Sequence, residues 1–322
     1  MTKGRAYLLL VLTFLIWSSS FVATRVLVGE DVPAAQRLNA LEFVIARFLP
    51  VAVAAWLWLG LDRRARGTAR RVMTEQPGRL VLLSLFSVWT YNLAFGFGQN
   101  RVPPGTASLV VAGNPAWTFV LTALLGQERP TWRKASGLLL AFVGLYLVVT
   151  RGAGRAIEPA YWLDAVVLLG APISWATYTV MSKPVVGRFS PFHLTLTTLA
   201  VAGLPVLPLA AFHRGLWAKV LAWPLERYAA VAFLSIACTL LGYWLWSVAL
   251  EVLPATTASS FTFLNPPLAI LSEWIWLGQK PSSGLLLGGL VVLAGLWLVA
   301  RGGRRPAPVA NPAPTALGSG QE

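Results

Sequence analysis

Long apolar runs recur along the chain, separated by short polar segments. Each run has about the 20 residues that a helix needs to cross roughly 30 Å of hydrocarbon. The first run continues from Tyr7 to about Val28, too long for the core of a signal peptide, and is expected to remain as a span. The pattern predicts ten membrane-spanning helices, over residues 6–28, 40–60, 79–98, 104–125, 132–150, 161–181, 192–212, 227–249, 255–277 and 283–301.

Composition agrees with this pattern. Of the 322 residues, 56% are apolar and 12% are charged, whereas a soluble domain is about 45–50% apolar and about 25% charged. Because so few polar groups cannot cover a water-facing globule, the expected fold class is an all-α integral membrane protein with the lipid bilayer as its partner. The net charge of +14 is expected to come from basic cytoplasmic loops rather than from nucleic-acid binding.

The basic residues also predict orientation. If the amino terminus is inside, the segments of the first half expected inside hold 11 Lys and Arg residues, and those expected outside hold 4. In the second half the corresponding numbers are 5 and 4. Cytoplasmic loops carry the excess of Lys and Arg, so both termini are predicted to be cytoplasmic, in a cell inner membrane.

Polar, proline and glycine residues recur at an offset of 151 residues. Chance alignment of apolar helices does not readily reproduce such residues. In the first copy they are Pro103, Thr106, Ser108, Asn114, Pro115, Pro130, Gly137 and Gly144, and Ala107 recurs with them. Further upstream the offset is 158, so that Trp17 corresponds to Trp175 and Arg25 to Lys183.

This recurrence predicts two five-helix repeats, residues 1–151 and 160–301, followed by a disordered cytoplasmic tail over 302–322. Because five is odd, the second copy enters the membrane from the opposite side. The two repeats are therefore expected to be inverted about an axis in the membrane plane, as in many secondary transporters.

The order and spacing of several motifs resemble the EamA-type unit of the drug/metabolite transporter superfamily over about residues 5–301. The motifs are Trp17-Ser18-Ser19-Ser20-Phe21, Arg47-Phe48, Ala107-Ser108, Pro115, Glu128 thirteen residues later, and the pair Gly137 and Gly144. The second copy departs from the pattern, with Gln279 and Lys280 where an acidic residue is usual. The resemblance implies a ten-helix bundle around a central cavity that opens alternately to each side. Bacterial proteins of this kind commonly export amino acids or related metabolites.

The two Asn-Pro motifs are the best local candidates for a site. A proline inside a span frees the carbonyl four residues earlier, and at membrane depth that carbonyl must be satisfied by protein or by cavity water. Asn114 and Asn265 are therefore candidates for binding a zwitterionic or amide-like substrate; the alternative is that each only caps a kink. The predicted hinge residues are Pro115, Pro266 and Pro267.

Charged and aromatic residues within the spans extend the candidate set. Arg47 and Glu273 qualify because intramembrane charges are functional candidates by default; the alternatives are a structural arginine and an interfacial glutamate. An aromatic wall suits apolar side chains and can hold an ammonium by cation–π contact, with core packing as the alternative. The remaining cavity candidates are Trp17, Tyr91, Asn92, Trp175, Tyr178, Tyr243 and Trp246.

These residues favour a carrier over a channel, a receptor or a membrane-embedded enzyme. The chain has two histidines, His193 and His213, one cysteine, Cys238, and no phosphate-binding loop, so no catalytic residue, metal or cofactor is expected. The expected substrate is a small neutral or zwitterionic metabolite such as an amino acid. A phosphorylated or nucleotide-linked sugar is the runner-up, but it requires several cavity cations and only Arg47 clearly qualifies. A homodimer is left open.

The charge bias predicts the outcome of reporter fusions. A reporter fused after Arg305 and one inserted within residues 63–79 should both read as cytoplasmic, because both positions belong to the basic side. Alkaline phosphatase and green fluorescent protein fusions give opposite signals on the two sides of the membrane. Phosphatase activity at either position would contradict the predicted orientation.

Overall fold

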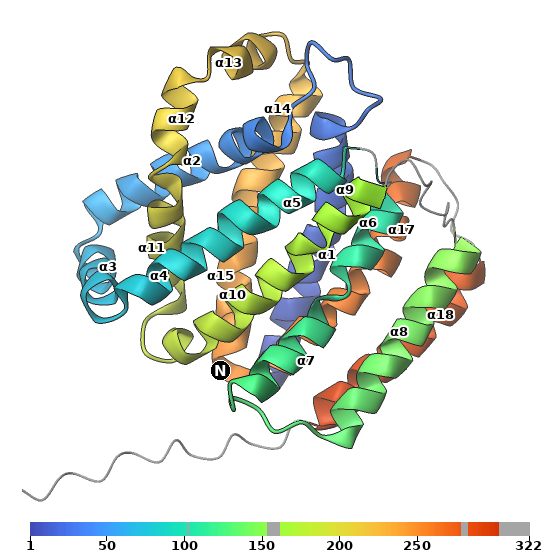
Figure 1. Cartoon of the computed structure of the whole chain (residues 1–322). Coiled ribbons are helices and arrows are strands. Elements are labelled where there is room, and N and C mark those ends of the chain that lie inside the picture. Colours follow the sequence, from blue (N-terminus) through green and yellow to red (C-terminus); the bar gives the residue numbers. More distant parts are fainter. Residues whose placement is uncertain (101, 103, 153–161, 278–282, 303–322) are drawn as a thin grey trace, which may run out of the picture.

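The computed structural model describes residues 1–100, 102, 104–152, 162–277 and 283–302, and this part of the chain is helical with no strand (Figure 1). The first half contains α1 (Lys3–Val28), α2 (Ala40–Leu61), α3 (Arg63–Glu75), α4 (Pro77–Ser84), the π-helical η1 (Leu85–Thr90), α5 (Tyr91–Gly98), α6 (Pro104–Val111), α7 (Asn114–Leu124) and α8 (Trp132–Gly152). Further along the chain follow α9 (Trp162–Leu168), α10 (Gly170–Val186), α11 (Pro191–Gly203), α12 (Val206–Phe212), α13 (Arg214–Leu221), α14 (Leu225–Ala232), the π-helical η3 (Phe233–Leu241), α15 (Gly242–Val252), α16 (Ala255–Ser260), the 3₁₀-helical η4 (Phe261–Leu264), α17 (Asn265–Leu277) and α18 (Ser283–Gly302).

Five helical stretches among the described residues are long and apolar enough to cross a membrane: Lys3–Val28, Ala40–Leu61, Pro77–Gly98, Pro191–Phe212 and Leu225–Val252. The other five predicted spans are also mainly helical over their described residues. An all-α membrane fold is therefore correct, and the number of ten spans stays a prediction. The predicted tail, apart from Gly302, lies outside the described residues.

Large apolar side chains cover the outside of the bundle. Leu8, Leu139 and Leu290 expose 68%, 62% and 66% of their surface. A water-soluble protein rarely exposes contiguous apolar surface of this kind. These side chains fit an outer face in contact with lipid.

Two basic side chains tie pairs of helices together at corresponding sequence positions. Arg25 at the end of α1 donates to the carbonyl oxygens of Gln99 and Asn100, at 3.3 and 3.0 Å. Lys183 of α10 donates to the carbonyl oxygens of Leu250 and Glu251, at 2.5 and 3.4 Å. The two pairs of acceptors are 151 residues apart, so the sequence repeat extends to these contacts.

A segment of the second half, residues 213–223, is bound to the start of α2. The buried Glu42 accepts the backbone N–H of Asn39 and pairs with Lys219 of α13 at 2.6 Å. Gln36 donates to the carbonyl oxygen of Ala222 at 3.0 Å. Polar contacts therefore hold α13 against the end of α2 that lies opposite α3.

Helices α8 and α18 run antiparallel in close contact and lie side by side in Figure 1. Their glycines face one another: Gly137 approaches Gly295, and Gly144 approaches Gly288. A methyl group at Gly295 would lie 2.6 Å from the backbone nitrogen of Ala141 and 2.7 Å from the carbonyl oxygen of Gly137. Small residues allow such backbone contact between membrane helices.

Gly295→Ala should therefore lower the free energy of unfolding by about 1–3 kcal/mol, because an added methyl forces two backbones apart. Gly289→Ala is the matched control on the same helix, since a methyl there meets nothing within 4 Å. Thermal unfolding in detergent compares the two variants. Equal stability of Gly295→Ala and wild type would contradict the close contact.

Candidate functional site

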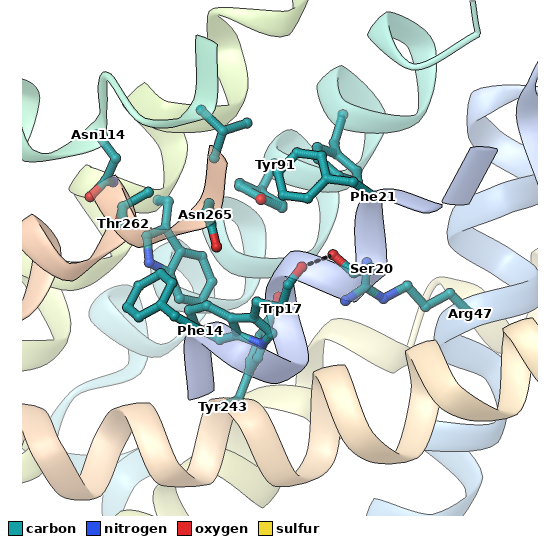
Figure 2. Close-up of a pocket in the computed structure, with 13 residues that line it drawn as sticks. Phe14, Trp17, Ser20, Phe21, Arg47, Tyr91, Asn114, Tyr243, Thr262 and Asn265 are labelled. Carbon is teal, nitrogen blue, oxygen red and sulfur yellow. Dashed lines mark hydrogen bonds between the residues drawn. The ribbon is translucent and has the colours of Figure 1, made fainter. Parts of the chain in front are cut away.

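A cavity of about 40 Å³ lies in the interior of the bundle (Figure 2). A buried water needs about 10–15 Å³ of this kind of volume, so the cavity has room for roughly three waters. Side chains from α1, α2, α5, α6, α7, α10, α15, η4 and α17 surround it. The lining residues are Phe14, Trp17, Ser20, Phe21, Arg47, Tyr91, Phe95, Val111, Asn114, Trp175, Tyr243, Thr262 and Asn265.

The cavity brings together seven of the residues singled out from the sequence: Trp17, Arg47, Tyr91, Asn114, Trp175, Tyr243 and Asn265. Three others stand behind this lining. Asn92 is bound to Arg47, while Tyr178 and Trp246 pack against the Trp175 ring with centroids at 4.9 and 5.7 Å. The side chain of Glu273, in α17, is outside the described part of the chain.

Each Asn-Pro motif begins a new helix. Helix α6 ends at Val111 and α7 begins at Asn114, while η4 separates α16 from α17, which begins at Asn265. From the sequence a kink is expected at each motif; in the structure the regular α-helix is interrupted there, while Gly113, Phe261 and Asn265 keep right-handed helical backbone angles. The reason is that a proline in the first turn of a helix needs no backbone donor. The hinge residues Pro115, Pro266 and Pro267 all lie in such first turns.

Three side-chain oxygens at these breaks have no hydrogen-bond partner in the described part of the chain. They are Oδ1 of Asn114, Oδ1 of Asn265 and Oγ1 of Thr262, and all three residues are buried. The amide nitrogen of Asn114 is engaged, donating to the carbonyl oxygen of Pro172 at 3.2 Å. An unsatisfied buried acceptor costs about 1–3 kcal/mol, so these oxygens are suited to a ligand that brings donors.

Arg47 supplies the charge of the cavity. Its side chain is only 4% exposed, and a guanidinium keeps its proton in proteins. It donates from Nε to Oγ1 of Thr239 and from Nη1 to Oδ1 of Asn92, each at 3.1 Å, and its Cζ lies 5.4 Å from the ring centroid of Phe48. Among the ion pairs of the described residues, none involves Arg47. Figure 2 shows it beside Ser20, across the cavity from Asn114 and Thr262.

The two partners of Arg47 lie in or next to π-helical segments. Asn92 follows η1 and donates to the carbonyl oxygens of Ser87 and Val88. Thr239 lies within η3 and donates to the carbonyl oxygen of Leu234. Each side chain thus satisfies carbonyls of the widened turn before it and presents an oxygen to the guanidinium. Single π-turns inside helices are frequent at functional sites.

Aromatic rings form the rest of the wall. Trp17 and Trp175 meet edge to face with ring centroids 5.1 Å apart, and Tyr243 lies 5.1 Å from Trp175. Their polar tips point to backbone acceptors: Trp17 Nε1 donates to Cys238 O and the Tyr243 hydroxyl donates to Ser87 O, both at 2.8 Å. These bonds fix the rings, so that the surfaces they offer a ligand are apolar faces and edges.

Six lining residues are absent from the set chosen on sequence: Phe14, Ser20, Phe21, Phe95, Val111 and Thr262. The helical period contained the signal for the three phenylalanines. Phe14, Trp17 and Phe21 are spaced i, i+3 and i+7, and Phe95 follows Tyr91 by four residues, so each shares a helix face with a chosen aromatic.

An all-helical bundle with a lipid-facing surface and a polar cavity at broken helices has the arrangement of a membrane transporter. The model of the EamA-like transporter family matches residues 4–150 and 162–301, and the chain belongs to this family. Its relatives include a "Probable terminal-alkyne amino-acid exporter" of Streptantibioticus cattleyicolor, 28% identical over 94% of this chain and 95% of that protein.

The chain is also similar to two further relatives that are named as a transporter or an efflux pump, and to one solved structure. An "Uncharacterized transporter" of Archaeoglobus fulgidus is 25% identical over 92% of this chain and 99% of that protein. A "Probable amino-acid metabolite efflux pump" of Salmonella typhimurium is 23% identical over 65% of this chain and 74% of that protein. A solved crystal structure aligns with 93% of this chain and 99% of its own, with a TM-score of 0.67 and 21% identity, a likeness of fold alone.

Proposed function

We propose that the protein exports a small zwitterionic metabolite of the amino-acid type across the inner membrane by alternating access. The observation that carries the proposal is the pairing, in one cavity, of a desolvated cation with oxygens that lack donors. The names of the Streptantibioticus and Salmonella relatives, a "Probable terminal-alkyne amino-acid exporter" and a "Probable amino-acid metabolite efflux pump", support the same substrate class.

Arg47 is the proposed receptor for the substrate carboxylate. Burying a cation costs several kcal/mol unless a counter-charge and hydrogen bonds offset it. Two neutral oxygens, those of Asn92 and Thr239, supply hydrogen bonds but no negative charge. A carboxylate would add the missing charge, and the planar guanidinium suits it geometrically.

The opposite side of the cavity is the proposed place for the substrate ammonium. The free amide oxygens of Asn114 and Asn265 only accept hydrogen bonds, and the free hydroxyl of Thr262 can accept one as well. The faces of Trp17 and Trp175 add cation–π attraction for an ammonium.

The proposed transport cycle rests on the helix breaks and on the repeated contacts. A cavity of about 40 Å³ must widen to admit a metabolite, and the breaks at residues 112–113 and 261–264 are where the flanking helix pieces can change angle. The matched contacts of Arg25 and Lys183, and the facing glycines of α8 and α18, support two five-helix repeats that rock against each other. Inverted repeats of this kind place the substrate near the bilayer midplane.

A phosphorylated or nucleotide-linked sugar is the less favoured substrate. Its charges call for several cations, and among the described lining residues Arg47 is the one that carries a charge. Arg25 and Lys183 are occupied by backbone carbonyls instead.

Metabolite profiling of the medium tests the substrate class directly. Cells that express the protein should accumulate one or a few amino-acid-like compounds outside at higher levels than cells without it. Purified protein in vesicles should then transport the same compounds without ATP. Enrichment of sugar phosphates alone would overturn the proposed class.

Arg47→Gln should abolish the preference for a carboxylate. Wild-type protein should transport the amino acid at least about tenfold better than its carboxamide analogue, because a hydrogen bond to a charged group is worth about 1.5–3 kcal/mol. In the variant this ratio should fall toward one. Arg188→Gln, at an exposed position outside the cavity, is the control. An unchanged ratio in Arg47→Gln would leave Arg47 a structural residue.

Asn114→Ala and Asn265→Ala should each reduce transport about tenfold at normal levels of folded protein, because each removes an acceptor worth about 1–3 kcal/mol. Asn→Ser at the same positions keeps a side-chain oxygen and should restore part of the rate. Rates are measured in vesicles and corrected for the amount of protein in the membrane. If both alanine variants transported at the wild-type rate, the substrate site would not include Asn114 and Asn265.

A further inference from the structure

Helix α3 is a basic, amphipathic helix at the end of a span. Ala65, Ala69 and Val72 are buried and form its inner face, against α11, α4 and α2. The outer face carries five arginines within thirteen residues, Arg63, Arg64, Arg66, Arg70 and Arg71, and one acid, Glu75. Figure 1 shows α3 at the end of α2, beside α4.

A groove of about 590 Å³ runs between the end of α2 and α3. Its floor is largely apolar, and two arginines stand among its lining residues. They are Trp56, Leu59, Gly60, Arg66, Ala69, Arg70, Met73 and Thr74. The groove continues the lipid-facing surface of α2, where Leu57 and Leu61 expose 61% and 84% of their surface.

The arginines of α3 differ in how they are engaged. Arg66 donates to the carbonyl oxygens of Leu59 and Gly60 and so closes the end of α2. Arg71 pairs with Glu75 at 3.2 Å. The guanidinium of Arg70, in the groove, makes no hydrogen bond or ion pair with any other described residue, and Arg70 is exposed.

The acids near the groove do not neutralise Arg70. Glu75 is paired with Arg71. Asp62 caps α3, accepting the backbone N–H of Arg64 at 2.8 Å, and lies 3.6 Å from Nε2 of His193. The backbone N–H of Arg64 holds the pKa of Asp62 below its usual range. The positive charge of Arg70 is therefore left for a partner from outside the chain.

We propose that this groove binds an anionic phospholipid. The phosphate lies at Arg70, with the guanidinium of Arg66 beside it, and an acyl chain lies over Trp56, Leu59 and Met73. A phospholipid is the occupant that fits because the groove is apolar along one side and cationic at its rim. It also opens where a span ends, which is the level of the headgroups. A Lys or Arg near an anionic membrane surface is worth about 1 kcal/mol, which is about fivefold in binding.

Lipid retention tests the headgroup contact. Full-length protein is reconstituted in phosphatidylcholine containing one-fifth phosphatidylglycerol, extracted in mild detergent, and its bound lipids are counted by native mass spectrometry. Wild type should retain phosphatidylglycerol over phosphatidylcholine about fivefold beyond their ratio in the membrane. Arg70→Gln should bring this preference close to one. Arg64→Gln, which removes the same charge from α3 outside the groove lining, should keep it.

Equal losses in Arg70→Gln and Arg64→Gln would overturn the proposal, because they would indicate diffuse surface charge rather than a site. The proposal would also be overturned if inorganic phosphate alone raised the unfolding temperature as much as phosphatidylglycerol does. The occupant of the groove would then be a soluble anion rather than a lipid. Both results are read on protein whose folding is checked by size-exclusion chromatography.

A second pair of variants tests the acyl-chain contact. A Cβ atom added at Gly60 would meet nothing within 4 Å, and Gly60 lines the groove. Gly60→Leu should therefore fill the groove without a clash and reduce phosphatidylglycerol retention about fivefold or more. Gly67→Leu, equally open but outside the groove lining, should retain wild-type binding. If Gly60→Leu retained phosphatidylglycerol at the wild-type level, the acyl chain of the lipid would not lie in this groove.

Discussion

Backbone groups in hydrocarbon must be paired within the protein, and this constraint governs where the molecule can depart from regular helix. Most of the described chain keeps its helical bonds. The ladder is interrupted between α6 and α7 and again at η4, and both interruptions border the cavity. Each is followed by Asn-Pro, which starts the next helix without demanding a backbone donor. The site thus forms where the constraint is relaxed, and the uninterrupted helices around it hold it in place.

A second constraint on the structure comes from a cation that is buried between segments far apart in the sequence. Arg47 comes from α2, one acceptor comes from the start of α5 and the other from η3, and Ser235 of η3 donates to the Arg47 carbonyl at 2.7 Å. Any relative movement of α2 and η3 must therefore rearrange the hydrogen bonds of the guanidinium. In the proposed transport cycle, the substrate carboxylate and the positions of these helices would act on the same group, so that binding and movement would be coupled through Arg47.

Much of this arrangement follows from the sequence, and the failures have one cause. Apolar runs located the helices, and the repeat singled out Asn114, Asn265, Trp17 and Trp175, which share the cavity. It was harder to predict which face of each helix points into the bundle. A membrane helix is apolar toward both lipid and core and shows little periodic contrast between them. For that reason Tyr178 and Trp246 were indistinguishable from lining residues. Phe14 and Phe21 could have been selected, because their spacing places them on the helix face of Trp17. The π-helical turns that position Asn92 and Thr239 depend on tertiary contacts, and the groove beside α3 depends on how that helix folds back.

The contact between α8 and α18 and the contact between α13 and α2 differ in which interactions are lost when the helices separate. Separating α8 from α18 would open a seam of glycine and valine backbone with nothing to replace the lost contacts. Separating α13 from α2 would release Lys219 from Glu42 and Gln36 from a carbonyl, groups that water can solvate at once. The two sides are therefore held in different ways: one by close contact of backbones, and the other by polar contacts that include an ion pair with a buried carboxylate.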